Sequence, residues 1–161
     1  MRIATIGTVL IVTVGCGSGS PSGPGGGATQ ASITLTANPN PIAGVECRRC
    51  GAQSTDREAV TALTIQETAG VGGTVASIAM VLRETGTNAL IASGEFDTAA
   101  VVSLAGSSRV PPSGSLVVMS IGVHYPRDQG GRSATLTYTV RLTDDRGNPV
   151  SRDLSVPVSV T

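Results

Sequence analysis

The two cysteines at positions 47 and 50 form the one motif of this sequence whose residue types suggest reactivity. Cys47 and Cys50 enclose Arg48 and Arg49, and neighbouring cations lower the pKa of a thiol, as they do in redox cysteines. A redox pair at this spacing normally opens a helix after a strand, whereas this pair is predicted to lie in a long loop. Haem attachment by the usual motif would need a histidine at position 51, which is Gly51. We therefore expect Cys47 and Cys50 to form a small loop-closing disulfide, typical of an oxidising compartment.

Other candidates for chemistry are isolated in the sequence. His124 is the single histidine, and the alternation around it points its side chain away from the core. A structural zinc site needs four ligands, and the chain has neither a second cysteine pair nor a second histidine. Residues 144–148 (DDRGN) lack the alternating acids and final glutamate of a calcium loop, and they suit a tight turn. We predict no catalytic residue, no metal site and no cofactor. The alternative is an exported redox or hydrolytic enzyme that uses the Cys47/Cys50 pair or His124.

The third cysteine, Cys16, ends an apolar segment near the start of the chain. The run from residue 3 to residue 14 follows Arg2, and as a helix it would be about 18 Å long. A bilayer core is roughly 30 Å thick, so this run is too short to span it comfortably. A charged start, a brief apolar core and small residues at the end are typical of a secretory signal, here residues 1–15.

The end of this signal resembles the lipobox of bacterial lipoproteins. The matching residues are Thr13-Val14-Gly15-Cys16, and the resemblance implies that Cys16 is acylated and that the signal is removed just before it. Gly17, not aspartate, follows the cysteine. By resemblance to sorted lipoproteins, this implies the outer membrane in a two-membrane cell, with the domain facing the periplasm or the cell surface. The segment from Cys16 to residue 31 is rich in Gly, Ser and Pro, and a flexible coil of this length spans about 20 Å. The alternative is an ordinary signal peptide followed by a free cysteine.

Composition excludes some partners. The 161 residues carry 11 cations and 11 acidic residues, and every cation is an arginine. These arginines are scattered, so they do not form the basic stripe that nucleic acid requires. One Phe, two Tyr and no Trp disfavour base or carbohydrate stacking. We expect no nucleic-acid partner. The expected partners are the membrane, through the N-terminal lipid, and an envelope protein or surface ligand.

From residue 32 onward, apolar and polar residues alternate with period two, which indicates strands. Strands are predicted at 33–36, 59–68, 75–83, 89–92, 117–125, 134–142 and 154–160. In the strand at 117–125, the inward set is predicted to include Val117, Met119 and Ile121. In the strand at 134–142, Leu136 and Val140 are predicted to be buried. Residues 94–110 are predicted as an irregular strand, with one helical turn as the alternative. Pro157 has no N–H to donate, so the last strand is predicted to lie at a sheet edge or to pair at Pro157 only on its other side. Seven or eight strands with turns between them predict an all-β, antiparallel β-sandwich over residues 32–161.

The same region resembles bacterial immunoglobulin-like domains. The segment ITLTANPNPI looks like their opening strand and proline break, and TLTYTVRLTDDRGNPVSRDLSVPVSV looks like their last two strands. Tyr138-Thr139-Val140 is similar to the tyrosine-containing strand of fibronectin type III sandwiches. The resemblance implies binding, spacing or adhesion, and no active site. The prediction is therefore a membrane-anchored cell-envelope lipoprotein whose immunoglobulin-like domain is a non-catalytic binding, adhesion or structural module.

Overall fold

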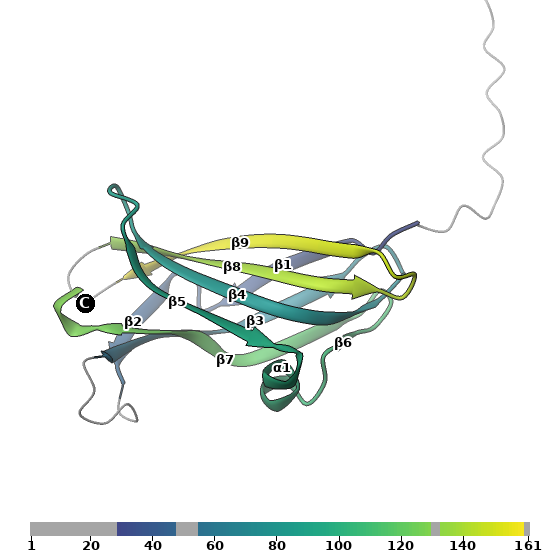
Figure 1. Ribbon diagram of the computed structural model, residues 1–161, viewed down its shortest axis with the longest axis horizontal. Coiled ribbons are helices and arrows are strands. Elements are labelled where there is room, and N and C mark those ends of the chain that lie inside the picture. The colour runs from purple at the N-terminus through teal and green to yellow at the C-terminus, as the bar shows by residue number, and fades with distance from the viewer. Residues whose placement is uncertain (1–28, 48–54, 130–132, 160–161) are drawn as a thin grey trace, which may run out of the picture.

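The computed structural model describes residues 29–47, 55–129 and 133–159 (Figure 1). The predicted all-β class is confirmed, because strands account for most of the described chain. Nine strands are present in these ranges, rather than the seven or eight predicted. They are β1 (Ile33–Asn38), β2 (Ile42–Glu46), β3 (Thr55–Glu67), β4 (Gly73–Glu84), β5 (Leu90–Asp97), β6 (Arg109–Val110), β7 (Ser115–Pro126), β8 (Ser133–Asp144) and β9 (Pro149–Ser159). The described helices are α1 (Thr98–Ala105) and a short 3-10 turn, η1 (Arg127–Gln129).

The strands form two faces that are joined by β2. On one face β3 pairs antiparallel with β1 along one edge and with β7 along the other. The other face has the order β9-β8-β4-β5, with β6 also paired to β4. β2 pairs antiparallel with β3 and parallel with β9, where Ile42 lies opposite Val158. Figure 1 shows β9, β8, β4 and β5 in front, with β1 and β3 behind them. The parallel β2–β9 pair corrects the prediction of a wholly antiparallel arrangement.

The helix α1 corrects the prediction of an irregular strand at 94–110. The Asp97 side chain accepts a hydrogen bond from the Ala100 N–H, and Gly106, at φ 74°, ends the helix by donating to the Val102 carbonyl. These contacts are typical start and stop signals. The two residues that give these signals, Asp97 and Gly106, flank the helix. The eight helical residues between them are too few to show a helical period. No helix in the described part of the chain is long and apolar enough to cross a membrane.

Period-two alternation places the core between the two faces. Leu136 and Val140, both predicted to be buried, are fully inaccessible to solvent. Tyr138, on the same side of β8, is also fully buried, and its hydroxyl donates to the Ile121 carbonyl of β7 at 3.4 Å. This bond links the two faces, because β8 and β7 lie in different faces. β9 pairs with β8 along its length and with β2 at its last two residues, so it lies between two strands and the predicted edge position is wrong. At Pro157 itself, the described chain pairs β9 only with Thr135 of β8, which agrees with the alternative prediction.

The middle of β7 departs from the predicted alternation. Val117 and Met119 were expected to face inward, but they are 43% and 54% exposed, while Val118 is buried. At Met119 and Ser120, β7 gains one residue over β3, and Ser120 adopts a φ of 54°. A bulge of one residue moves every later side chain to the opposite face. After the bulge, Ile121 and every second residue that follows face inward, as predicted. Before the bulge, the even-numbered residues face inward instead of the odd-numbered ones.

The buried carboxylate of Glu67 holds one end of the sandwich together. It is 1% exposed and accepts hydrogen bonds from the backbone N–H groups of Ser32, Ala69, Gly70 and Ser113. Burial raises the pKa of Glu67, but these four donors outweigh it and lower the pKa to about 2. The start of β1 and the two loops beside it are therefore fixed to the end of β3.

A second buried carboxylate, Asp144, lies at the same end. It accepts hydrogen bonds from the backbone N–H groups of Ala31, Arg146 and Asn148 and from the Asn148 side chain. Burial raises the pKa of Asp144, but the bonds from Asn148, Ala31 and Arg146 lower it to about 2. The turn predicted at 144–148 is thus built around Asp144 as a hydrogen-bond acceptor, and it also anchors the residues that enter β1.

Candidate functional site

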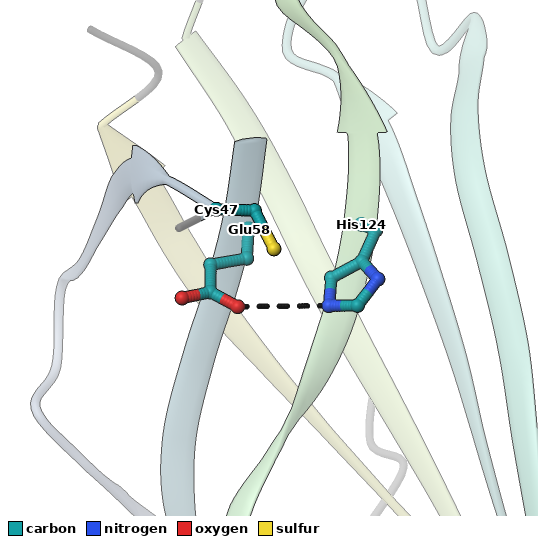
Figure 2. Close-up of side chains that lie close together, drawn as sticks. All are labelled: Cys47, Glu58 and His124. Atoms are coloured by element: carbon teal, nitrogen blue, oxygen red, sulfur yellow. Dashed lines mark ion pairs between the residues drawn. The ribbon is translucent and has the colours of Figure 1, made fainter. Parts of the chain in front are cut away.

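Three polar side chains that are far apart in the sequence meet at the other end of the sandwich. Cys47 follows β2, Glu58 belongs to β3 and His124 belongs to β7. One ligand atom from each lies within 4.8 Å of the other two. Figure 2 shows the Glu58 carboxylate pointing toward the His124 ring, with the Cys47 sulfur above the space between them. We call these three residues the Cys–Glu–His cluster.

Strand pairing explains why these side chains meet. β3 lies between β2 and β7, with Glu58 opposite Val45 of β2 and opposite His124 of β7. Directly opposed side chains on one face of an antiparallel pair have Cβ atoms about 5 Å apart. The next residues along, Ala59 and Val123, are buried, so Glu58 and His124 must face outward. The prediction that His124 points away from the core is confirmed.

The Glu58–His124 contact is open to solvent. His124 Nε2 lies 3.6 Å from Glu58 Oε2, and the side chains are 55% and 30% exposed. An exposed pair of this kind contributes at most about 1 kcal/mol to stability. A second exposed pair, Arg127 with Glu46, lies at the same end and has an N···O distance of 2.5 Å. The polar groups here therefore contribute little to the free energy of folding and are accessible to a ligand.

A groove of about 1310 Å³ lies beside the cluster. Glu58 and His124 form part of one wall, and the opposite wall is the stretch of β5 from Ser93 to Phe96. The buried Met80 of β4 also lines it. The charged side chains along it are Glu46, Arg57, Glu58, Glu95 and His124. The groove therefore has a lining of mixed polarity, in which carboxylates outnumber the cations.

Two buried polar atoms near the groove have no hydrogen-bond partner within the part of the chain that the structure describes. They are the Tyr125 hydroxyl oxygen and Arg57 Nε, and their residues lie opposite each other on β7 and β3. Burial raises the pKa of Tyr125, and the charge of Arg57 opposes that shift. Gly44 makes room for the ring, because a Cβ at this position would lie 2.0 Å from the tyrosine oxygen. Two polar atoms at this end of the core are thus left without a hydrogen bond. Each such atom lowers the stability of the folded protein by about 1–3 kcal/mol.

The predicted site residues have different outcomes in the structure. Cys16 and Cys50 lie outside the described residues, so lipidation and the Cys47–Cys50 disulfide stay predictions. The Cys47 sulfur is already engaged in an interaction, and a disulfide would account for it. Within the described chain, His124 interacts with Glu58, and no serine hydroxyl there hydrogen-bonds to it. The described groups can hold a cation or pass a proton between carboxylate and imidazole, but they do not form a Ser–His–Asp arrangement.

Sequence reasoning missed Glu58 as a neighbour of His124. Both residues sit at outward positions of alternating strands, which is the one signal the sequence offers. The register that places them opposite each other joins strands more than 60 positions apart in the chain. Alternation alone does not give that register, so the pair could not be found without the fold.

Comparisons with known proteins do not identify the chain. No known protein-family profile matches it, and no curated protein matches it. Among solved structures, it is similar to an X-ray structure of a Northeast Structural Genomics Consortium target, with 9% sequence identity and a TM-score of 0.48. That likeness covers 80% of this chain and 86% of the other. At this level, the likeness carries no argument about function.

Proposed function

We propose that this chain is a membrane-anchored cell-envelope lipoprotein whose immunoglobulin-like sandwich is a non-catalytic binding, adhesion or structural module. The strand order supports the immunoglobulin-like assignment. β1, β3 and β7 occupy the places of strands A, B and E, and β5, β4, β8 and β9 occupy those of C′, C, F and G. β2 continues β1 and moves to β9 of the other face. Anchoring rests on the signal and lipobox of the sequence.

One observation carries the proposal: the described chain enters the sandwich at one end, and the groove lies at the other. The first described residues enter β1 beside Glu67, where the Ser32 N–H donates to its carboxylate. Glu58, in the groove wall, lies nine residues earlier on the same strand, β3. At about 3.3 Å per residue, this places Glu58 roughly 30 Å from Glu67, at the end where the chain enters β1. In Figure 1, β1 begins on the right, while β2 ends and β3 begins on the left. A lipid at Cys16 would thus leave the groove facing away from the membrane.

The groove suits a protein or peptide ligand. Its volume exceeds the 300–1,000 Å³ of common small-molecule pockets, and it is open and mixed in polarity. Its two long walls, β5 and β7, each have one paired neighbour among the described strands, β4 and β3 respectively. Strand edges of this kind can accept an extended segment of a partner. The exposed Met119 and Val117 on β7 add apolar contact area nearby.

The second candidate function is the exported redox or hydrolytic enzyme. The Cys–Glu–His cluster is the observation that favours it. Thiol state discriminates between the two, because a redox enzyme must cycle Cys47 and Cys50 between thiols and disulfide with a partner. A binding module would keep them in one state.

Anchoring is tested by Cys16→Ser. This variant should leave the membrane fraction, because a 12-residue apolar run and a flexible linker cannot hold the domain in a bilayer. The wild-type chain should remain with membranes after a carbonate wash. Retention of Cys16→Ser in washed membranes would contradict the lipoprotein proposal.

Binding through the groove is tested by two matched substitutions on β3. Val60→Arg places a long cation in the groove wall, whereas Thr64→Arg makes the same change four residues along the same face, outside the groove. With anchored protein as bait in membranes, a crosslinked envelope partner should be lost with Val60→Arg and kept with Thr64→Arg. Equal loss or equal retention for both variants would show that the groove is not the binding surface.

A further inference from the structure

We propose that Cys47, Glu58 and His124 form a binding site for a divalent transition metal of the zinc class, and that thiol reduction opens this site. This inference is independent of the proposed binding role of the groove. It concerns only the three side chains of the Cys–Glu–His cluster. Sequence spacing gives no indication of it, because the ligands come from three separate strands or strand ends.

The geometry of the cluster is close to that of a tetrahedral site. Zinc bonds of 2.0–2.3 Å hold neighbouring ligand atoms about 3.3–3.8 Å apart. His124 Nε2 and Glu58 Oε2 are already 3.6 Å apart, and all three ligand atoms lie within 4.8 Å of one another. The largest of these ligand–ligand distances therefore needs to shorten by about 1.5 Å at most. Glu58 and His124 are partly exposed, so rotation about their side-chain bonds can supply this movement.

The ligand atoms favour a borderline-soft metal. A thiolate, an imidazole and one carboxylate select zinc-like ions over calcium or magnesium, which prefer oxygen ligands alone. Three protein ligands leave a fourth position for water. Glu58 and His124 are held opposite each other by the β3–β7 pairing, so two of the three ligands are pre-positioned. Glu46 and Glu95 line the same groove and favour a cation, against the opposing charge of Arg57.

The thiol state controls whether the site can form. The Cys47 sulfur is already engaged in the structure, and a disulfide sulfur is not a thiolate ligand. If the bond is to Cys50, a phosphine reductant cleaves it, takes one oxygen from water and leaves two thiols. The metal then replaces the proton of the Cys47 thiol. Metal binding is thus expected in the reduced protein and not in the oxidised one.

The test uses the full chain with Co²⁺ as a spectroscopic probe. After phosphine reduction, the wild-type protein should bind one equivalent of Co²⁺ with a thiolate-to-cobalt charge-transfer band, and Zn²⁺ should displace it. The unreduced protein should show no such band. Cys50→Ser should bind Co²⁺ without reductant, because its Cys47 has no disulfide partner in the chain other than Cys16. Cys50→Ser is therefore studied in the Cys16→Ser background.

Substitution of the other ligands separates this site from binding by cysteines alone. Glu58→Gln and His124→Gln should each weaken binding at least tenfold, while Asp153→Asn, at an exposed position of β9 outside the groove, should bind as wild type does. Circular dichroism confirms that each variant is folded, since Glu58 and His124 are surface residues. The proposal is overturned if the reduced protein lacks the charge-transfer band. It is equally overturned if Glu58→Gln and His124→Gln bind Co²⁺ as tightly as the control.

Discussion

Replacing Glu67 with glutamine should destabilise the domain at neutral pH and have far less effect in acid. Oε1 of Glu67 accepts from the N–H groups of Ser32 and Ala69, and Oε2 accepts from those of Gly70 and Ser113. A glutamine side chain has the same shape but replaces one oxygen with an NH₂ group. Whichever way the amide is turned, two backbone donors then face another donor in a buried site.

The size of the effect can be worked out in two ways. Hydrogen bonds to a charged group contribute about 1.5–3 kcal/mol each, and the substitution removes two of them and weakens the others. Independently, the pKa of Glu67 falls from 4.5 to about 2 in the folded protein, and each pKa unit corresponds to about 1.4 kcal/mol. The first route gives about 3–6 kcal/mol and the second about 3.5 kcal/mol, so we expect a loss of roughly 3–4 kcal/mol in the free energy of unfolding at pH 7.

The dependence on pH has a definite sign. Because the folded-state pKa of Glu67 lies below its unfolded value, the carboxylate stabilises the fold fully above about pH 4.5, and this contribution is lost as the pH falls toward 2. The pKa of Asp144 is lowered to about 2 as well, so the wild-type protein loses its contribution over a similar range. Glu67→Gln removes the pH-dependent stabilisation by Glu67 and leaves that by Asp144 in place. The difference between wild type and variant should therefore shrink steadily between pH 4.5 and pH 2.

Urea unfolding followed by circular dichroism at pH 7, 4 and 2.5 measures this difference. Glu95→Gln is the matched control, because Glu95 is 56% exposed and makes a 3.7 Å contact with Arg141. Its effect should stay below about 0.5 kcal/mol at every pH. A Glu67→Gln effect that is the same at pH 7 and pH 2.5, or no larger than that of Glu95→Gln, would refute the reasoning.

Three further predictions concern the core and the cysteines. Val140→Asp should unfold the domain by placing an unpaired charge at a fully buried position, and a thermal melt followed by circular dichroism that retains the strand signal would contradict this. Tyr125→Phe should lower the free energy of unfolding by less than about 1 kcal/mol or should raise it, because the hydroxyl removed has no hydrogen-bond partner in the described part of the chain. A loss above about 2 kcal/mol in urea unfolding would show that the hydroxyl does make a hydrogen bond. The double variant Cys47→Ser/Cys50→Ser should fold and lose no more than about 2 kcal/mol, because a loop of about four residues closes at little entropic cost. Mass spectrometry that finds free thiols at both positions of the untreated wild type would contradict the disulfide.

Much of the strand content could be predicted from period-two alternation. The buried positions Leu136 and Val140 and the outward position His124 were predicted correctly, because along a strand every second side chain faces the same layer. The signals for α1 are also in the sequence, as an aspartate cap at Asp97 and a left-handed glycine at Gly106. They lie at the ends of a segment too short to show a period, and a strand was predicted there instead.

Where the alternation of apolar and polar residues predicts the wrong face of a strand, or predicts no strand, long-range strand pairing decides the structure. The bulge at Met119–Ser120 reverses the faces of β7, and it appears only in the register of β7 against β3. β2 has little apolar alternation of its own, and it becomes a strand by pairing with both β3 and β9. The sequence by itself determines the all-β class and most strand positions. Only the tertiary structure decides that Glu58 lies opposite His124. The register between two strands is set by the packing of the whole strands, because a shift of one residue would turn each side chain to the other face.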